Sequence, residues 1–456
     1  MAEDTAEQTG AADRSPAAAA PGAITALGRT LSSVVEVGRD LLARRRQNQQ
    51  AGSSTDAASN LVGNCHALLD HRGEASGLAL ACEVVTGYKA LAPERRLAFF
   101  NALAFEFDVD RERVLAAADA YRAVPNLDNL WHIGRAVEAP RQKLFRRVNT
   151  APDGTATLVE MRGHLLPLLK THPELKGVDA DLKELFISWF NKGFLELRRI
   201  DWSSPAAVLE KIIAYEAVHQ INGWDDLRSR LGDDRRCFAF FHPALRDDPL
   251  VFVEIALTDE VPATLAPLLQ QEREAPQRNA TTVVFYSISN CHPGLSQISF
   301  GNFLIKSVVE ELRKEIHSLD TFVTLSPVPG FRRWLLSADI DALVPAELVD
   351  RVREPVGPVI VAEVYDALKK LCAHYLLNVK SGRLPKDAVA RFHLGNGAIL
   401  HQLNSSADLS AKGREQSAGI MVNYLYDMAR IEENHDAYFD SGKIAVSRAV
   451  TKLLET

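Results

Sequence analysis

Apolar residues between about Asn60 and Ile200 recur at intervals of three and four, which is the spacing of one face of an α-helix. The stretch "LAPERRLAFFNALAFEF" shows the pattern most plainly, and its Pro93 suits the first turn of a helix. The apolar stripe of this stretch consists of Leu97, Phe100, Ala104 and Phe107. Strand signals are scarce in this part of the chain. The pattern therefore predicts a bundle of helices.

Beyond residue 200 the pattern changes to short apolar and β-branched runs that are separated by turns. Two such runs in "RRCFAFFHPALRDDPLVFVEIALTD" flank a polar turn, and "ATTVVFYSIS" and "DTFVTLSP" predict two further strands. A long amphipathic helix lies between the last two runs. Its inward face consists of Ile305, Val308, Val309, Leu312 and Ile316. The fold class is therefore α+β, an N-terminal all-α bundle followed by a mixed α/β domain.

Three segments follow from these patterns and from the local composition. Residues 1–55 are rich in Ala, Gln, Ser and Thr and predict a disordered extension. Residues 56–200 form the helical domain, and residues 201–456 form the mixed α/β domain. Within the extension, "LGRTLSSVVEVGRDLLARRR" has the pattern of an amphipathic helix, which we expect to dock loosely rather than to anchor the chain in a membrane.

Composition and charge exclude some classes of function. The 456 residues are 46% hydrophobic and 24% charged, which is typical of a soluble globular protein. A net charge of -7 and a pI near 6.0 give no broad basic field for nucleic acid or anionic lipid. No apolar run approaches the roughly 20 residues that span a bilayer. Any anionic ligand must therefore be bound locally.

The cysteines and the chain ends predict a cytoplasmic, bacterial setting. Glu3, Asp4, Glu7 and Asp13 do not suit a transit peptide, and the final "KLLET" lacks a peroxisomal signal. The cysteines are widely spaced, contain no CxxC pair and form no metal-ligand grouping with histidine, so we interpret them as reduced thiols. They are Cys65, Cys82, Cys237, Cys291 and Cys372.

The segment "TTVVFYSISNCHPGLSQISFGNFLIKSVVEEL" joins a strand to a helix through a loop flanked by Gly294 and Gly301. Gly301 and Asn302 open the helix, whose first turn leaves backbone N–H groups free to meet an anion. The segment lacks both the P-loop and the dinucleotide-binding patterns. Its spacing is that of a phosphate cradle, and an ordinary strand-to-helix turn stays open as the alternative.

Three other residues are candidates for chemistry. Ser326 in "LSPVPGF" precedes a proline, which is typical of a turn, and it lacks the GxSxG context of many hydrolases. His393 in "VARFHLGNG" is predicted at the end of a strand, on the same face as Arg391, before a hairpin turn at Asn396 and Gly397. The segment "GIMVNYLYDM" places Tyr424 and Tyr426 on a predicted helix, where each phenol is either a hydrogen-bond donor or a packing group.

Several motifs in order along the chain resemble the malonyl-CoA decarboxylase family. They are "GLSQISFGNFLIKSVVEEL", "TLSPVPGF", "RFHLGNGAILHQLN" and "GIMVNYLY", with weaker support from "HQINGWDDLRSRLGDDRRCF" and "ALTDEVPATLAPLL". The likeness runs from about residue 60 to the end of the chain. The extension lies outside it.

The resemblance implies a helical domain that serves self-association, as a homotetramer, and a catalytic domain similar to GNAT-type acetyltransferases. It implies a cradle for the pyrophosphate of coenzyme A, which is part of the substrate, and neither a metal nor a further cofactor. The cradle consists of Ser296, Gln297, Ile298, Ser299, Phe300, Gly301 and Asn302. Ser299 stands where the family often has a glutamate, so the resemblance does not carry over to this chain any role of that carboxylate in orienting substrate.

The resemblance also makes Ser326 and His393 the catalytic pair and matches Tyr426 to an active-site tyrosine. Loss of carbon dioxide from a malonyl thioester leaves an enolate, which needs hydrogen-bond donors and a proton. His393 is the expected proton donor, Ser326 the expected partner of the departing carboxylate, and Tyr426 a support for both. The alternatives are an acyl-CoA acyltransferase, a serine hydrolase that uses Ser326 and His393, and a catalytically silent acyl-CoA sensor.

Overall fold

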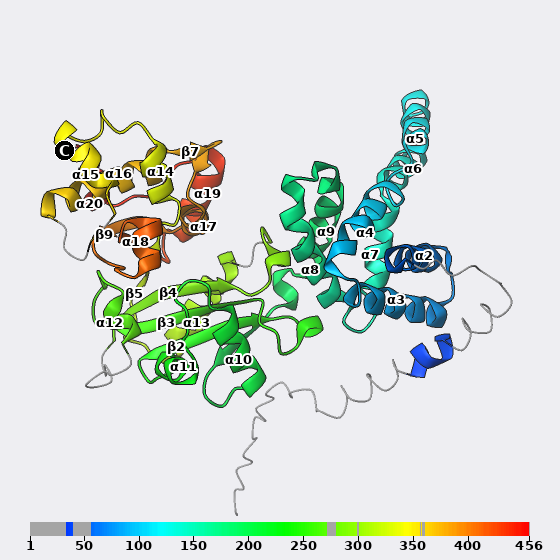
Figure 1. Ribbon diagram of the computed structural model, residues 1–456, viewed down its shortest axis with the longest axis horizontal. Helices are drawn as coiled ribbons and strands as arrows, with labels where there is room; N and C mark the ends of the chain where they lie inside the picture. Colours follow the sequence, from blue (N-terminus) through cyan, green and yellow to red (C-terminus); the bar gives the residue numbers. More distant parts are fainter. Residues whose placement is uncertain are drawn as a thin grey trace, which may run out of the picture. The chain divides into compact units, whose positions relative to one another are not determined.

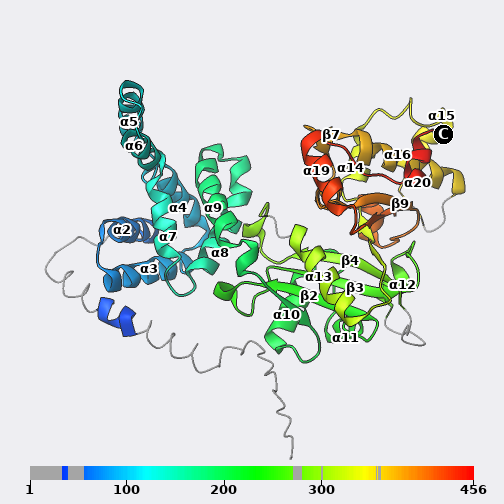
Figure 2. The same cartoon turned by 180° about the vertical axis from the view of Figure 1, so that it is seen from behind.

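The computed structural model describes residues 33–39, 56–270, 280–298, 301–355, 357 and 361–455. Most of the predicted extension lies outside the described residues, as do Ser299 and Phe300 of the predicted cradle. The chain divides into two compact units, Met1–Leu158 with His172–Val178 and Val159–Thr171 with Asp179–Thr456. Figures 1 and 2 show the elements of both units from two sides.

The first unit is helical, as the spacing of apolar residues predicts. Its helices are α2 (Ala57–Asp70), α3 (Glu74–Lys89), α4 (Pro93–Phe105), α5 (Arg111–Ala123), α6 (Leu127–Val137) and α7 (Pro140–Val148). Two more helices contribute residues to both units, α8 (Gly154–Leu165) and α9 (Lys176–Trp189). Pro93 begins α4 as predicted, and Phe100 and Phe107 are buried. Short 3-10 turns lie at η1 (Leu166–Lys170), η2 (Pro173–Leu175) and η3 (Lys192–Phe194).

The second unit contains a sheet that has eight strands among the described residues. The strands are β1 (Glu196–Ile200), β2 (Arg235–Phe241), β3 (Val251–Thr258), β4 (Thr282–Asn290), β5 (Thr321–Thr324), β6 (Ser326–Pro327), β9 (Ile399–Asn404) and β10 (Met421–Leu425). Their order is β1-β2-β3-β4-β5-β10-β6, and β9 pairs with β10. A separate pair joins β7 (Lys380–Ser381) to β8 (Leu384–Pro385). The strands predicted from the sequence at β2 to β5 are confirmed.

Strands β4 and β5 are parallel, whereas the other pairs in the sheet are antiparallel. A parallel pair needs a crossover, which α13 (Gly301–Glu315) supplies. The inward face predicted for this helix is confirmed at Ile305, Val308, Val309 and Leu312, which are buried. The fifth predicted residue, Ile316, lies after the end of the helix and is only partly buried. The succession of strand, loop, helix and parallel strand agrees with the acetyltransferase-like fold that the resemblance implies. The α+β class with an N-terminal helical region is confirmed.

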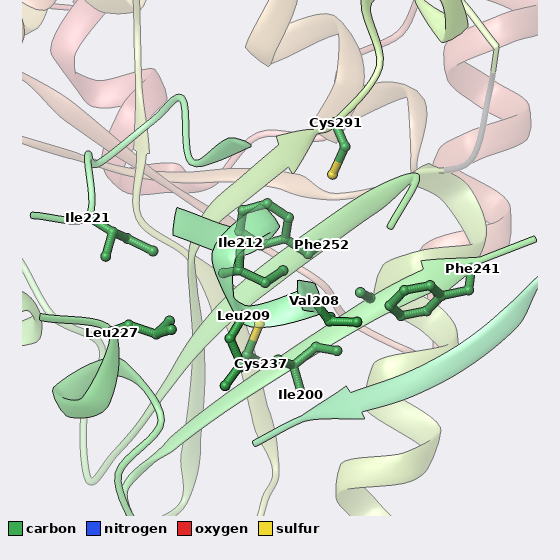
Figure 3. Close-up of a cluster of buried hydrophobic side chains, with 11 residues drawn as sticks. Ile200, Val208, Leu209, Ile212, Ile221, Leu227, Cys237, Phe241, Phe252 and Cys291 are labelled. Carbon is green, nitrogen blue, oxygen red and sulfur yellow. The ribbon is translucent and has the colours of Figure 1, made fainter. Parts of the chain in front are cut away.

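Side chains along β2 point alternately to the two faces of the sheet, and helices cover both faces. Cys237 and Phe241 pack with Phe252 of β3 against Val208 and Ile212 of α10 (Ala206–Tyr215), in a cluster of eleven buried side chains (Figure 3). The residues of β2 that alternate with these point to the other face, toward α13, where Arg236 forms an ion pair with Glu315. Both faces of the central strands are therefore buried, which explains their continuous apolar runs.

The remaining helices of the second unit are mostly C-terminal, in yellow to red in Figure 1. They are α11 (Trp224–Arg230), α12 (Ala266–Leu269), α14 (Phe331–Ser337), α15 (Ala346–Arg353), α16 (Ala362–Asn378), α17 (Ala388–Gly395), α18 (Ala411–Ser417), α19 (Ile431–Ser441) and α20 (Arg448–Glu455). Two 3-10 turns, η4 (Pro243–Leu245) and η5 (Pro293–Leu295), precede strand β3 and helix α13.

Three predictions of local structure were wrong. Residues 196–200 are the edge strand β1 and not helix, because pairing with β2 orders a segment whose own composition is mostly charged. His393 lies on helix α17, because the carboxylate of Asp387 accepts the N–H groups of Val389 and Ala390 and so caps a helix there. Tyr424 lies on strand β10, whose residues are buried on both faces and therefore show no alternation.

The predicted hairpin turn at Asn396 and Gly397 is also wrong, because these two residues end α17. Asn396 is the C-cap of the helix. Gly397 has the positive φ that the sequence suggested, at 82°. A Cβ atom there would come within 2.0 Å of the carbonyl oxygen of Ile431, so only glycine fits.

Candidate active site

Ser326 begins β6, two residues after β5 ends, where it pairs with Val422 of β10. Its hydroxyl is buried and donates a hydrogen bond to Oγ1 of Thr324 at 3.0 Å. Thr324 is itself fixed, because its Oγ1 accepts the backbone N–H of Tyr424 on β10. The strand pairing therefore holds the Ser326 hydroxyl in one place.

His393 lies on the last turn of α17 and is buried. Its Nε2 is 3.1 Å from Oγ of Ser326, and its Nδ1 is 2.8 Å from the hydroxyl of Tyr426, which follows β10. The imidazole also stacks on the ring of Tyr424, with ring centroids 4.6 Å apart. The structure therefore brings together Ser326, His393 and Tyr426, which the sequence separates by up to a hundred residues.

The hydrogen bonds assign the tautomer of His393. The hydroxyl proton of Ser326 is directed at Thr324, so Oγ accepts from an Nε2–H of His393. In a neutral imidazole Nδ1 then carries no proton and accepts from the hydroxyl of Tyr426. Burial lowers the pKa of His393 from 6.5 to about 3 and raises the pKa of Tyr426 above its usual value. Both groups are uncharged at neutral pH.

The lowered pKa of His393 makes the stability of the protein depend on pH. The unfolded chain takes up a proton at this histidine as the pH falls through 6.5, whereas the folded chain does so only near 3. The native state therefore loses stability as the pH falls between these values. Replacing His393 with glutamine removes this contribution. We expect the free energy of unfolding of wild type, relative to His393→Gln, to fall by about 2 kcal/mol from pH 7 to pH 5, in urea titrations at both pH values. An unchanged difference would show that His393 titrates normally in the folded chain.

Asp387 joins the segments that carry Ser326 and His393, and the sequence reasoning missed it. Its Oδ1 caps α17, and its Oδ2 accepts the N–H of Gly330 in the turn after Ser326 at 3.3 Å. The carboxylate is buried, with 2% of the residue exposed, and burial raises its pKa. An aspartate two residues ahead of "VARFHL" is a helix N-cap signal that could have identified α17.

A cavity of about 470 Å³ opens onto Ser326 and His393. Its other walls come from β4, from α17 and from the loop residues Gln297 and Ile298. Ser326, His393 and part of the predicted cradle therefore face one cavity. Tyr426 does not line it and reaches the site through Nδ1 of His393.

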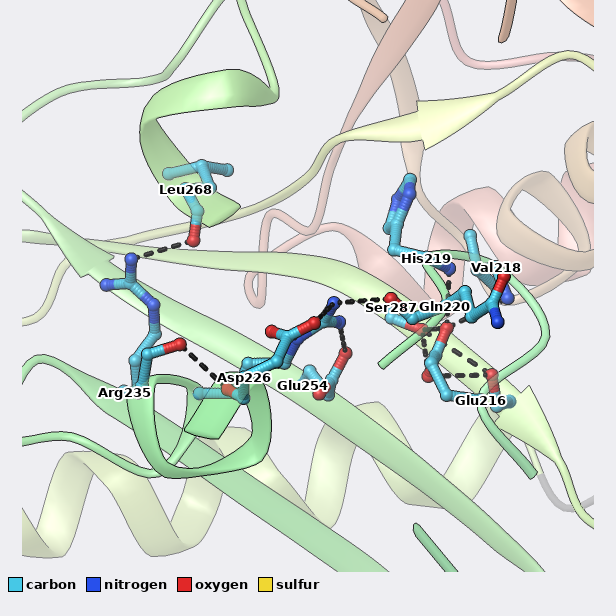
Figure 4. Close-up of polar contacts among 12 residues, drawn as sticks. Glu216, Val218, His219, Gln220, Asp226, Arg235, Glu254, Leu268 and Ser287 are labelled. Carbon is cyan, nitrogen blue, oxygen red and sulfur yellow. Dashed lines mark hydrogen bonds and ion pairs between the residues drawn. The ribbon is translucent and has the colours of Figure 1, made fainter. Parts of the chain in front are cut away.

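The wall from β4 contains Ser287, which the sequence analysis did not single out. The Ser287 hydroxyl lies 2.8 Å from each carboxylate oxygen of Glu216, and Ser289 donates to the same carboxylate at 3.1 Å. The backbone N–H groups of Val218 and His219 also bind Glu216 (Figure 4). Two serines at alternate positions of an otherwise apolar strand were the signal for this polar wall.

The described residues of the predicted cradle lie in the loop before α13 and in its first turn. Ser296, Gln297 and Ile298 follow the turn η5, and α13 begins at Gly301, so Asn302 lies in its first turn. Gln297 has a positive φ of 64°. Among the described residues no helix is long and apolar enough to cross a membrane. Within the same part of the chain no group of three acidic, histidine or cysteine side chains is placed to hold a metal ion.

Comparisons with known proteins match two family models to the chain. Residues 107–190 match the family model of the malonyl-CoA decarboxylase N-terminal domain, and residues 193–456 match that of the C-terminal domain. Malonyl-CoA decarboxylase, mitochondrial, of Anser anser anser is 33% identical over 413 residues, which cover 81% of this chain and 82% of that protein.

Two solved structures are similar to this chain in fold and sequence. The crystal structure of malonyl-CoA decarboxylase from Rhodopseudomonas palustris is 49% identical, with a TM-score of 0.81. That from Agrobacterium vitis is 46% identical, also with a TM-score of 0.81. Each likeness covers 87% of this chain and 99% of the other.

Proposed function

The chain belongs to the malonyl-CoA decarboxylase family, so its activity is the decarboxylation of malonyl-CoA, and we propose that the reaction takes place in the cavity that Ser326 and His393 line. The observation that carries this proposal is the 3.1 Å contact between Oγ of Ser326 and Nε2 of His393 in the cavity wall. The cradle loop meets the same cavity, which supports placing coenzyme A there.

The reaction breaks the bond between the carboxylate and the α-carbon of the malonyl group. The electron pair of that bond forms a thioester enolate, carbon dioxide leaves, and the α-carbon then takes up one proton to give acetyl-CoA. Fixed hydrogen-bond donors stabilise such a developing charge, and one donor is worth about two to three orders of magnitude in rate. The protein must therefore hold the carboxylate, stabilise the enolate and deliver a proton.

His393 is the proposed proton donor. Burial alone keeps its imidazole uncharged at neutral pH. A malonyl carboxylate beside the ring favours the charged imidazolium and raises the pKa of His393. We propose that His393 takes up a proton as substrate binds and gives it to the α-carbon after carbon dioxide leaves. The hydrogen bond between Nδ1 and Tyr426 supports this role, since it fixes the plane of the ring.

Ser326 is the proposed partner of the substrate carboxylate. Its hydroxyl is already directed by Thr324 and by His393, so little side-chain freedom is lost when substrate binds. A nucleophile that forms an acyl-enzyme would need the opposite arrangement, in which the hydroxyl of Ser326 donates to an unprotonated Nε2 of His393. The two roles differ in their products, because an acyl-enzyme releases free coenzyme A.

Single-turnover conversion of malonyl-CoA by the purified protein tests the proposal. We expect carbon dioxide and acetyl-CoA in equal amounts, because each enolate that forms is protonated. The products are followed in the same quenched samples, with free coenzyme A and malonate measured alongside. Free coenzyme A with malonate would indicate hydrolysis, and bound malonyl-CoA without product would indicate a sensor. Either result would contradict decarboxylation at this site.

The assembly and the location of the protein stay predictions. Leu127, Leu130 and Trp131 of α6 are exposed, which supports self-association through the helical region. The five cysteines, all in the described part of the chain, are free thiols, which supports a reducing compartment such as the cytoplasm.

A further inference from the structure

The loop that leads to α13 contains a tight turn with an unusual residue at its third position. The N–H of Ile298 donates to the carbonyl of Leu295 at 3.0 Å, which closes a β-turn over these residues. Ser296 has φ -54° and ψ 136°, and Gln297 has φ 64°. These are the angles of a type II turn, whose third position favours glycine. A glutamine in this conformation is strained, so something else must hold it there.

Arg162 of α8 is the group that holds this turn. Its side chain is fully buried, and its Nη1 donates to the carbonyls of Gly294 at 2.7 Å and Ser296 at 2.8 Å. Its Nε donates to the carboxylate of Asp179 at 2.8 Å, which fixes the plane of the guanidinium. All of these residues belong to the second compact unit.

The contact with Ser296 decides which way one peptide group faces. Type I and type II turns differ by a rotation of the central peptide, here the one between Ser296 and Gln297. Because the Ser296 carbonyl points to the buried guanidinium, the N–H of Gln297 points away from Arg162. This N–H has no acceptor among the described residues, and Gln297 lines the cavity. Rotation to a type I turn would relieve the positive φ but would present a carbonyl oxygen in place of the N–H.

We propose that Arg162 is a positioning residue that locks the Ser296–Gln297 peptide with its N–H available to the diphosphate of coenzyme A. The inference rests on the proposed function, in which this loop receives coenzyme A. A backbone N–H attracts a phosphate oxygen, whereas a carbonyl oxygen repels it. Lys183 assists from the side, because its Nζ donates to Oε1 of Gln297 at 2.8 Å. In this proposal the strain of the turn serves the binding of coenzyme A and not the packing of the loop.

The experiment compares two substrates, malonyl-CoA and the malonyl thioester of pantetheine, which lacks the diphosphate and the nucleotide. For Arg162→Gln we expect KM for malonyl-CoA to rise about tenfold or more, the effect of losing one hydrogen bond to a charged group. We expect kcat to change little, and kinetics with the pantetheine thioester to stay at the wild-type level. A structural defect would affect both substrates alike.

A second substitution provides a rescue that only a peptide lock predicts. Glycine adopts positive φ without strain. Adding Gln297→Gly to Arg162→Gln should therefore lower KM for malonyl-CoA most of the way back to the wild-type value. Gln297→Val with Arg162 intact should raise that KM, because a β-branched residue resists positive φ. The valine variant also keeps the test decisive if Arg162→Gln does not fold.

Arg141 offers a matched control in the first unit. It is also buried, and its Nη1 donates to Asp108 at 2.7 Å and to the carbonyl of Phe107. Arg141→Gln should leave both KM values unchanged. If wild type uses the two substrates with equal kcat/KM, coenzyme A does not bind at the cradle and the proposed function fails at that point. If wild type discriminates but Arg162→Gln raises both KM values alike without rescue by glycine, the lock alone is overturned.

Discussion

Replacing His393 with glutamine is expected to slow the release of carbon dioxide by roughly 10²- to 10⁴-fold, the range for loss of a general acid. Glutamine can still contact Ser326 and Tyr426, so the cavity should keep its shape and KM should change little. It cannot carry a proton to the α-carbon. The measurement is a quenched single-turnover assay with malonyl-CoA, with coenzyme A binding measured separately.

His401 provides the control for this substitution. It lies on β9, is partly buried and does not line the cavity. His401→Gln should therefore decarboxylate malonyl-CoA at the wild-type rate. If His393→Gln also stays within a few-fold of wild type, another group delivers the proton. Malonyl-CoA turnover in that case would leave the family assignment intact and remove only the role of His393.

Replacing Arg230 with methionine is expected to lower the free energy of unfolding by about 3–5 kcal/mol, the cost of breaking a buried ion pair from one side. The guanidinium of Arg230 donates to Asp226 at 2.9 Å and to Glu254 at 3.0 Å, and all three residues are buried, in the network of Figure 4. Burial already raises the pKa of Glu254 to about 8, although Arg230 opposes this shift. Removing the guanidinium leaves the carboxyl groups of Asp226 and Glu254 without the donor that they share. A urea titration measures the loss.

The control for Arg230 is an exposed ion pair of the same chemistry. Arg122 donates to Asp119 at 2.8 Å on α5, where both side chains are largely exposed. Because water screens this pair, Arg122→Met should change the free energy of unfolding by less than about 1 kcal/mol. Losses of similar size in the two variants would show that the buried network contributes no more than a surface contact.

Strands β2, β3 and β4 were predictable because their apolar runs are long and bounded by turns. The helix that carries His393 was not, because Val389, Arg391 and His393 alternate with apolar residues as a strand does. Its N-cap at Asp387 was the stronger signal, and an interaction with two backbone N–H groups outweighed the alternation. At α17 the N-cap outweighed the alternating pattern of the sequence. At β10 both faces are buried, so the alternation that identifies a strand is missing.

The candidate pair was predictable only through the resemblance to a family. From the residues alone Ser326 favoured a turn and His393 stayed open. The contact of Arg162 with the turn left no signal, because its partners there are backbone carbonyls, which every residue has, and they lie 132 and 134 positions away. Glu216 was missed for a related reason, since its serine partners are common residues and only their shared burial makes them a network.

The bond from Asp387 to Gly330 has a consequence for any attempt to transplant this site into another scaffold. One buried carboxylate fixes both the turn that follows the serine and the start of the helix that presents the histidine. Gly330 cannot be exchanged freely either, since a Cβ there would lie 2.2 Å from the Tyr375 hydroxyl. Residues 326–331 and 387–395 must therefore be transferred together. A chimera that took only one of these segments from a relative would lose the relative position of Ser326 and His393.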